Sequence, residues 1–204
     1  MPMKPAIAAA LALVAGLALV TAAKAQETAE AILAGGCFWC VEADMDKVAG
    51  VSDTVSGYIG GWTENPTYQS HSSDGHYEAV LVTFDPAVTS YRELLDIFWR
   101  TLDVVDSGGQ FCDRGPSYRT AIFVASDEKR AEAEASKAAA EAALGRTIVT
   151  PILDATTFWP AEDYHQDYYQ VSSFRYTGYR FACGRDRRVK QLWGDEAYQG
   201  LAKD

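Results

Sequence analysis

Hydrophobic and polar residues follow spacings along the chain that predict both strands and helices. Residues 76–84 alternate with a period of two, which predicts a strand with one strongly apolar face. From Phe38 onward, apolar residues recur at helical spacing and predict a helix that ends near Gly50. A pair of glycines joins the apolar run at 31–34 to this helix, which predicts a strand, a tight turn and a helix in succession.

The same reasoning extends through the rest of the chain. Further strands are expected at residues 51–61, 118–125 and 147–155. Ser90 and Glu93 form a capping box before a second helix. An Ala/Glu/Lys-rich helix over 126–145 has few large apolar residues and is expected to form an outer layer. We interpret 158–169 as an amphipathic helix rich in aromatic residues, and the basic tail from 172 as loop-like, with a last helix ending near Trp193.

These elements predict a single α+β domain with a mixed sheet covered by helices. No internal repeat or interdomain linker interrupts the pattern. Two long polar loops, 62–75 and 103–116, connect the elements, and loops of this length in a compact domain tend to be functional. We therefore expect the functional site at strand and helix ends, beside these loops.

Composition adds an expectation about export. A chain of 204 residues suits one domain with a sizeable core. Residues 1–25 have one early positive charge, an Ala/Leu/Val-rich run and small residues at 23–25, which together indicate a secretory signal peptide cleaved after Ala25. A retained membrane anchor is the alternative. We expect the mature domain, 26–204, to be exported, to the periplasm if the source is bacterial, with no membrane contact after cleavage.

Net charge excludes one class of function. The formal net charge is −10, and loss of Lys4 and Lys24 with the signal peptide leaves −12. Binding to nucleic acid through phosphate attraction needs a basic surface, so that role is excluded. An acidic surface otherwise indicates little about function, because such surfaces usually only keep a protein solvated. We expect the protein to be a monomer.

Cys37 is the first candidate for chemistry. It precedes the helix that starts at Phe38, where free backbone N–H groups and the helix dipole are expected to lower the pKa of a thiol. With Cys40 it forms a C-x-x-C motif, which suits an exported thioredoxin-like disulfide oxidoreductase, half of a zinc site, or chance. No metal is expected, since no second pair of ligands has zinc spacing. Two structural disulfides among the four cysteines are a further alternative.

Glu78 is the second candidate. It lies on the apolar face of the 76–84 strand, where desolvation would raise the pKa of its carboxyl toward neutrality. A lone glutamate at such a position more often turns toward water, so its neighbours decide the interpretation.

The motifs around both residues resemble those of the A-type peptide-methionine sulfoxide reductases. The signature is Gly36-Cys37-Phe38-Trp39. Further matches, in order, are Gly57-Tyr58, Gly60-Gly61, Asn65-Pro66-Thr67-Tyr68, Gly75-His76-Tyr77-Glu78-Ala79-Val80, Asp113-Arg114-Gly115-Pro116-Ser117-Tyr118-Arg119 and Ala161-Glu162-Asp163-Tyr164-His165-Gln166. The resemblance covers roughly residues 30–170, and so many ordered matches make chance implausible.

The resemblance implies a ferredoxin-like two-layer sandwich and a mechanism. Cys37 would attack the sulfur of methionine S-sulfoxide, free or in proteins, and become a sulfenic acid. Glu78 would donate a proton to the sulfoxide oxygen, and Tyr68 and Tyr118 would hydrogen-bond it. Phe38 and Trp39 would hold the substrate methyl group, and Asp113 would orient neighbouring groups.

A second thiol must then resolve the sulfenic acid. Cys183, within the tail 170–204, resembles the carboxy-terminal resolving cysteines of many family members and is our first candidate. Cys40 is the second, because it lies three residues from Cys37 on the same helix face. Cys112 is the third candidate. It departs from the family pattern and is either a third relay thiol or a half-buried spectator. No organic cofactor is expected, and electrons would arrive from a thioredoxin-like dithiol donor.

Overall fold

The computed structural model of the protein describes residues 1 and 27–202, so the predicted signal peptide lies almost wholly outside the described residues. The strands are β1 Ala29–Gly35, β2 Val51–Ile59, β3 Tyr77–Phe84, β4 Gly109–Gln110, β5 Asp113–Arg114, β6 Thr120–Val124, β7 Ile152–Asp154 and β8 Trp159–Pro160. The α-helices are α1 Phe38–Met45, α2 Tyr91–Trp99, α3 Asp127–Leu144, α4 Tyr168–Val171, α5 Ser173–Cys183 and α6 Arg185–Trp193. Short 3₁₀ turns cover Pro116–Tyr118, Asp163–His165 and Gly194–Glu196.

Six strands form one mixed sheet in the order β7-β6-β1-β3-β2-β8. β1 lies antiparallel to both β3 and β6, β2 pairs antiparallel with β3, and β6 pairs parallel with β7. The order of elements β1-α1-β2-β3-α2-β6 is the ferredoxin-like βαββαβ pattern. The α+β fold expected from the sequence is therefore confirmed.

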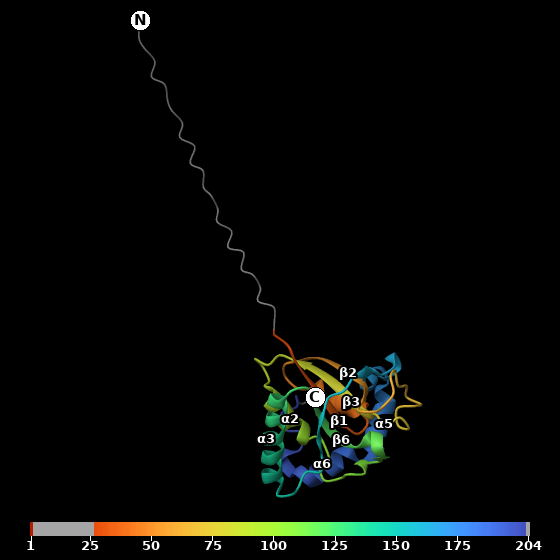
Figure 1. The fold of residues 1–204 in the computed structure, drawn as a ribbon. Helices are drawn as coiled ribbons and strands as arrows, with labels where there is room; N and C mark the ends of the chain where they lie inside the picture. Colours follow the sequence, from red (N-terminus) through yellow and green to blue (C-terminus); the bar gives the residue numbers. More distant parts are fainter. Residues whose placement is uncertain (2–26, 203–204) are drawn as a thin grey trace.

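The main hydrophobic core lies between one face of the sheet and the helices. Leu33 and Val82 of the sheet pack there with Val41 of α1, Phe98 of α2 and Trp193 of α6. Figure 1 shows α2 and α3 together at the left of the domain and α5 at the right. A smaller cluster that includes Tyr77 fills the other face of the sheet and is partly covered by residues 153–158. The molecule thus has two layers, with the helices on one face.

Two glycines make the turn between β1 and α1. A Cβ at Gly35 would lie 2.8 Å from side-chain atoms of both Leu102 and Val41, so the close packing of strand and helix excludes a larger residue. Gly36 has φ +85°, a conformation that L side chains rarely adopt, and a Cβ there would lie 2.5 Å from Cβ of Gln110. The turn brings Cys37 to the N-cap of α1, as the sequence predicts.

The carboxy-terminal region departs from two expectations. Residues 158–169 form the short strand β8 and a 3₁₀ turn, not one amphipathic helix, since Trp159 and Pro160 pair with β2. Proline has no N–H for a helix interior, which favours this edge position. The tail after 172 is helical rather than loop-like, because Val189 and Trp193 have apolar core positions to fill.

Helix α5 packs more loosely than α6. Its only buried residue is Tyr176, while Phe174 and Phe181 are 91% and 86% exposed. Gly184, with φ +69°, ends α5 and lets α6 start in a new direction. Polar contacts and covalent bonding, more than apolar burial, therefore hold α5 in place.

Among the helices of residues 27–202, none combines the length and the apolar content needed to span a bilayer.

The turn at Gly36 yields a prediction about stability. Gly36→Ala should lower the free energy of unfolding by about 2–4 kcal/mol, since it adds left-handed strain and displaces the buried Gln110 side chain. Gly145→Ala is the matched control, because Gly145 also has positive φ but no atom lies within 4 Å of the added methyl. Urea unfolding of both variants measures the difference, and equal losses would contradict the role assigned to Gln110.

Candidate active site

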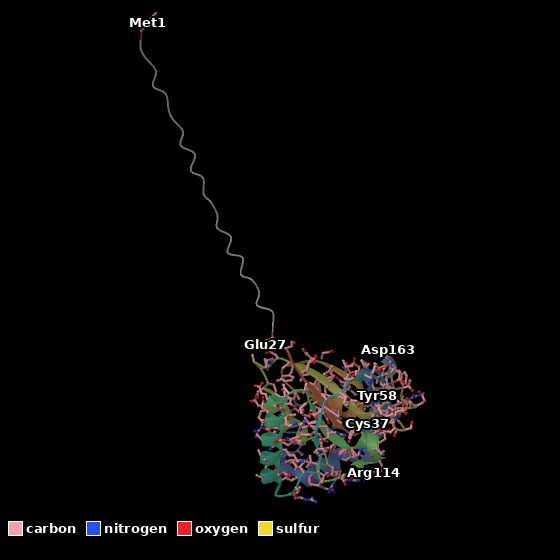
Figure 2. All side chains as sticks on the ribbon, in the orientation of Figure 1. Met1, Glu27, Cys37, Tyr58, Arg114 and Asp163 are labelled. Atoms are coloured by element: carbon pink, nitrogen blue, oxygen red, sulfur yellow. A yellow bond between two sulfur atoms is a disulfide. The ribbon has the colours of Figure 1, made fainter. Side chains whose placement is uncertain are left out.

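Cys37 lies at the amino-terminal end of α1, facing the tail. Its carbonyl oxygen accepts hydrogen bonds from the amides of Cys40 and Val41 and so starts the helix. The residue is only 6% exposed, and the hydroxyl of Tyr179 in α5 hydrogen-bonds to its sulfur. Figure 2 shows Cys37 on the α5 side of the domain, away from α3. Helix α5 thus covers the thiol.

Burial reverses the pKa expected for Cys37 from its helix position. Desolvation raises the pKa of the thiol, and the nearby Cys40 and Glu78 raise it further. The sequence-based expectation of a lowered pKa is therefore wrong for this closed arrangement. The physical reason is that burial beneath the tail excludes the water that would stabilise a thiolate.

Glu78 lies beside this thiol at the centre of the sheet. Its side chain is buried on the apolar face of β3, and one carboxyl oxygen, Oε2, accepts the amide N–H of Phe38 at 3.0 Å. Burial raises the pKa of Glu78 to about 8, although the hydrogen bond from Phe38 acts in the opposite direction. The carboxyl group is therefore protonated at neutral pH, as the strand alternation predicts.

His71, which the sequence analysis did not select, lies behind Glu78. Its Nδ1 is 2.8 Å from the carbonyl oxygen of Tyr68, which can only accept a hydrogen bond, so Nδ1 carries the proton. Burial lowers the pKa of His71, so the ring is neutral. Its unprotonated Nε2 lies 3.5 Å from Oε1 of Glu78. The imidazole thus adds no positive charge beside the carboxyl group.

The two tyrosines selected from the sequence meet at this site from separate loops. Tyr68 is 39% exposed, and its backbone amide donates to Oε1 of Glu162. Tyr118 comes from the 3₁₀ turn before β6, and its hydroxyl hydrogen-bonds to that of Tyr68. Burial raises the pKa of both phenols, and Glu78 and Cys37 add to this effect when they are ionised. Both are neutral hydroxyls that can donate hydrogen bonds.

Phe38 and Trp39 lie on different sides of α1. Phe38 is buried in the core, with its ring 5.0 Å from that of His165. Trp39 is half-buried, stacks on Tyr168 at 3.8 Å between ring centroids, and donates from Nε1 to Nδ1 of His165. Trp39 and Tyr168 therefore form an aromatic wall beside Cys37, with Phe38 beneath it.

Asp113 joins the second loop to α5. Its Oδ2 accepts a hydrogen bond from the hydroxyl of Tyr179, which also contacts Cys37. Burial raises the pKa of Asp113. Sequence reasoning missed Tyr179 because the tail was expected to be a loop, and the aromatic spacing Tyr176–Tyr179 was the only available signal.

Cys40 lies one helical turn from Cys37, and the two thiol groups share a hydrogen bond. It is 2% exposed and packs against Tyr176 of α5. The hydrogen bond from Cys37 lowers the pKa of Cys40, and the positive charges of Arg185 and Arg180 add to this, so that they outweigh burial. Of the two free cysteines, Cys40 is thus the more readily ionised.

Cys112 and Cys183 form a disulfide. Cys112 is exposed in the loop before Asp113, and Cys183 is the last residue of α5. The bond ties α5 to the second loop. Cys112 is therefore exposed and disulfide-bonded in this structure and is not a half-buried spectator, whereas its role as a third relay thiol stays a prediction. Together with Asp113, the two sulfurs are close enough to suggest a metal site, but sulfurs in a disulfide are not thiolate ligands.

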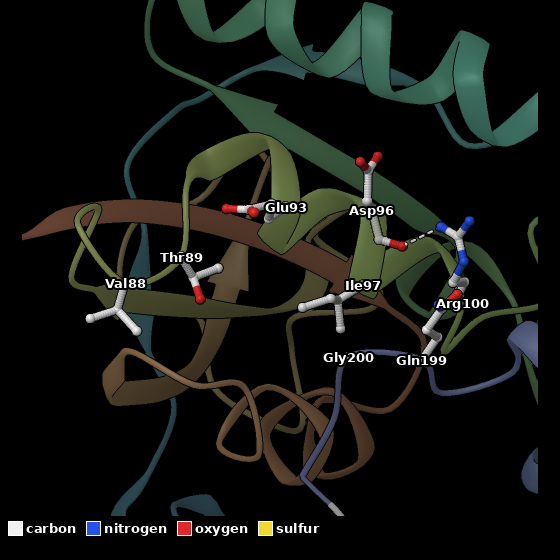
Figure 3. Close-up of a pocket in the computed structure, with 8 residues that line it drawn as sticks. All are labelled: Val88, Thr89, Glu93, Asp96, Ile97, Arg100, Gln199 and Gly200. Carbon is white, nitrogen blue, oxygen red and sulfur yellow. Dashed lines mark hydrogen bonds between the residues drawn. The ribbon is translucent and has the colours of Figure 1, made fainter.

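A pocket of about 350 Å³ opens away from these residues, between α2 and the segment at Gln199–Gly200 (Figure 3). Arg100 borders it and donates to the carbonyl oxygen of Asp96. Its lining contains none of the site residues expected from the sequence.

Comparison with known proteins agrees with this geometry. The family model described as peptide methionine sulfoxide reductase matches residues 29–197. Peptide methionine sulfoxide reductase MsrA 2 of Rhizobium meliloti is 53% identical over 184 residues, covering 90% of this chain and 93% of that protein. The protein of the same name from Caulobacter vibrioides is 50% identical over 189 residues, covering 92% and 95%.

Solved structures show the same fold. Reduced Mxr1 from Saccharomyces cerevisiae superposes with a TM-score of 0.68 at 29% identity, covering 74% of this chain and 88% of that chain. Methionine sulfoxide reductase A of Corynebacterium diphtheriae gives a TM-score of 0.63 at 30% identity, covering 72% and 76%.

The raised pKa of Glu78 yields a prediction that needs no activity assay. The folded protein retains the Glu78 proton up to about pH 8, whereas the unfolded chain loses it near 4.5, so this group's contribution to stability falls as pH rises between those values. The free energy of unfolding of Glu78→Gln, relative to that of the wild type, should therefore increase from pH 6 to pH 8, by at most about 3 kcal/mol. Urea unfolding at both pH values measures it. Glu134→Gln, on the exposed face of α3, should show no such change.

Proposed function

Because the chain belongs to the peptide methionine sulfoxide reductase family, we propose that it reduces the S epimer of methionine sulfoxide, free or within proteins, through Cys37. The observation that carries the proposal is the neutral carboxyl group of Glu78 beside a buried cysteine at a helix start. A sulfoxide oxygen must gain a proton as its S–O bond breaks, and a carboxylic acid with a pKa near 8 is still protonated at neutral pH.

In the first step, the sulfur of Cys37 bonds to the sulfoxide sulfur while Glu78 donates its proton to the sulfoxide oxygen. The S–O bond of the substrate and the transient bond between the two sulfurs then break as the oxygen bonds to the Cys37 sulfur. The thiol proton of Cys37 restores the carboxylic acid of Glu78, so the step has no net proton change. The products are methionine and a sulfenic acid on Cys37. Tyr68 and Tyr118 support the polarised oxygen, because both hydroxyl groups are neutral donors at the site.

The substrate's methyl group is proposed to lie against Trp39 and Phe38. The stacking of Trp39 on Tyr168 supports this, because it gives the aromatic wall a fixed orientation. Asp113 is proposed to act through Tyr179. The hydroxyl group of Tyr179 donates a hydrogen bond to Asp113 and also contacts Cys37. Tyr179 must move aside for a substrate sulfoxide to reach the cysteine.

Cys40 is proposed to resolve the sulfenic acid. The Cys40 thiol is already hydrogen-bonded to Cys37, whereas the Cys183 sulfur is bonded to Cys112. In addition, the residue of α5 that contacts Cys37 is Tyr179, one helical turn before Cys183. This reverses the order expected from the sequence, which put Cys183 first. Attack of Cys40 forms a Cys37–Cys40 disulfide and releases water.

A thioredoxin-like dithiol protein is proposed to supply the two electrons of each cycle, with no organic or metal cofactor. The exposed Cys112 supports an entry point at the Cys112–Cys183 disulfide, since an attacking thiolate must reach one of its sulfur atoms. The two thiols released there would then reduce the Cys37–Cys40 disulfide by thiol–disulfide exchange and become a disulfide again, so that the donor's two electrons reach Cys37 and Cys40. Export remains part of the proposal and is supported by the sequence of residues 1–25 alone.

The decisive experiment compares turnover of separate S and R methionine sulfoxides with dithiothreitol. We expect turnover of the S form only, with complete loss in Cys37→Ser and a loss of about 10²–10⁴-fold at pH 7 in Glu78→Gln. Thermal melts of both variants serve as the folding control. Absence of S turnover in the wild type, or activity that survives Cys37→Ser, would refute the proposed function.

The resolving thiol can be identified separately with a thioredoxin donor. Cys40→Ser should lose donor-dependent turnover while it still releases one equivalent of methionine in a single turnover. Cys183→Ser and Cys112→Ser should each retain that first turnover and the Cys37–Cys40 disulfide. A Cys37–Cys183 disulfide, detected by peptide mapping after one turnover of the wild type, would restore the order expected from the sequence.

A further inference from the structure

Two arginines from the carboxy-terminal helices meet α1 next to Cys40. Arg185, the first residue of α6, is 1% exposed, and Arg180 comes from α5. Both contact the buried carboxylate of Asp44. Asp44 lies four residues after Cys40, so the two side chains share one face of the helix. The arginines therefore lie against the face of α1 that carries Cys40.

Two contacts place the Arg185 side chain beside α1, one before the start of the helix and one near its end. Its Nη1 donates to the carbonyl oxygen of Gly35 at 3.3 Å, just before the turn to Cys37. Its Nε lies 3.7 Å from Oδ2 of Asp44, beyond the turn that holds Cys40. Arg180 donates to Oδ1 of Asp44 at 2.8 Å and to the hydroxyl of Tyr176, which packs in the same cluster as Cys40.

Arg185 has donors that no described protein atom uses. Its Nε and Nη2 are fully buried and make no hydrogen bond within residues 27–202, and Oδ2 of Asp44 also has none. A buried cation with unused donors is costly unless an anion accompanies it. Arg180 pairs closely with both Asp44 and the surface residue Asp186. Arg185 has only the longer contact with Asp44 and lies over the ring of Phe111 at 4.7 Å. A negative charge on Cys40 would therefore be stabilised mainly by the incompletely paired Arg185.

We propose that Arg185, assisted by Arg180, is a positioning residue for the resolving step, and that it holds Cys40 as a thiolate beside Cys37. The inference rests on the proposed function and assigns a role to two residues outside the motifs that identify the family. Neither arginine touches the substrate; both act through Cys40.

The chemistry requires this charge. The Cys40 thiolate attacks the sulfur of the Cys37 sulfenic acid, so that an S–S bond forms as the S–O bond breaks. The hydroxide that leaves takes a proton from solvent and departs as water. The two thiols are oxidised by two electrons, which balances the reduction of the sulfoxide in the first step. A neutral Cys40 thiol would be a far weaker nucleophile.

Other groups that face Cys40 act in both directions. The hydrogen bond from Cys37 and the two arginines favour the thiolate, while burial and Asp44 oppose it. Glu78 and the phenols of α5 also face the sulfur, and each would be disfavoured as an anion by a charged Cys40. Glu78 is protonated at neutral pH, so the arginines are the charges that favour the thiolate, in addition to the larger effect of the hydrogen bond from Cys37.

The test measures the ionisation of Cys40 in the full chain with its Cys112–Cys183 disulfide intact. In the Cys37→Ser background, Cys40 is the only free thiol, and its thiolate absorbance can be followed against pH. We expect Arg185→Met to raise the midpoint by about one pH unit, a tenfold smaller thiolate fraction at neutral pH, and Arg185→Lys to restore most of it. Arg188→Met is the matched control, because Arg188 lies on the same helix but pairs with Asp103.

A single-turnover experiment gives the second readout. With Cys37 present and reductant removed, Arg185→Met should release methionine at the wild-type rate but form the Cys37–Cys40 disulfide about tenfold more slowly, with a sulfenic acid that dimedone traps. Arg180→Met, nearer the surface, should shift both readouts less and in the same direction, which keeps the test valid if Arg185→Met fails to fold.

Each outcome is decisive. An unchanged midpoint and an unchanged rate of disulfide formation in a folded Arg185→Met or Arg180→Met variant would overturn the inference. Equal effects of Arg188→Met would do the same, since they would show a general response to a lost ion pair. Failure of the wild type to release methionine would instead refute the proposed function, so the two failures are distinguishable.

Discussion

A single hydrogen bond, from the amide of Phe38 to the buried carboxyl group of Glu78, ties the start of α1 to the centre of the sheet. Two opposing effects act on this carboxyl group. The amide at a helix start favours the anion, whereas burial on the apolar face of β3 favours the neutral acid, and burial is the larger effect. The outcome is a carboxylic acid that stays protonated at neutral pH and that is also held in one orientation. Cys37, one residue before Phe38, is placed beside this acid by the same bond.

The carboxy-terminal helices complete what the sheet and α1 begin. Helix α5 covers Cys37 with Tyr179, and α6 supplies the buried cation Arg185. The site therefore combines an apolar side, where Glu78 stays neutral, with a charged side, where Cys40 is more easily ionised. The pKa of the Glu78 carboxyl group is thus raised, whereas the pKa of the Cys40 thiol is lowered. This separation suits a reaction that needs an acid and a thiolate at the same pH.

Local sequence patterns predicted the parts of the molecule that depend on local physics. The glycine turn, the helix after Cys37 and the alternation around Glu78 are all set by neighbouring residues, and Tyr68 and Tyr118 followed from the family resemblance. The tail was not predictable in the same way. Arg185 belongs to the basic tail that was expected to be loop-like, yet it starts a helix and is buried beside Asp44, 141 residues earlier in the chain. The pairing of Cys112 with Cys183 likewise joins residues 71 positions apart, and cysteine spacing alone does not specify connectivity.

The Cys112–Cys183 disulfide also has a consequence for the lifetime of the folded chain. A cross-link that closes a loop of 71 residues removes conformational freedom from the unfolded chain, worth about 4 kcal/mol at room temperature in the loop-entropy description. That contribution is comparable with much of the net stability of an ordinary domain. The oxidised protein therefore resists unfolding and proteolysis better than its reduced form. The thiol–disulfide balance of the surroundings then affects how readily the polypeptide itself is degraded.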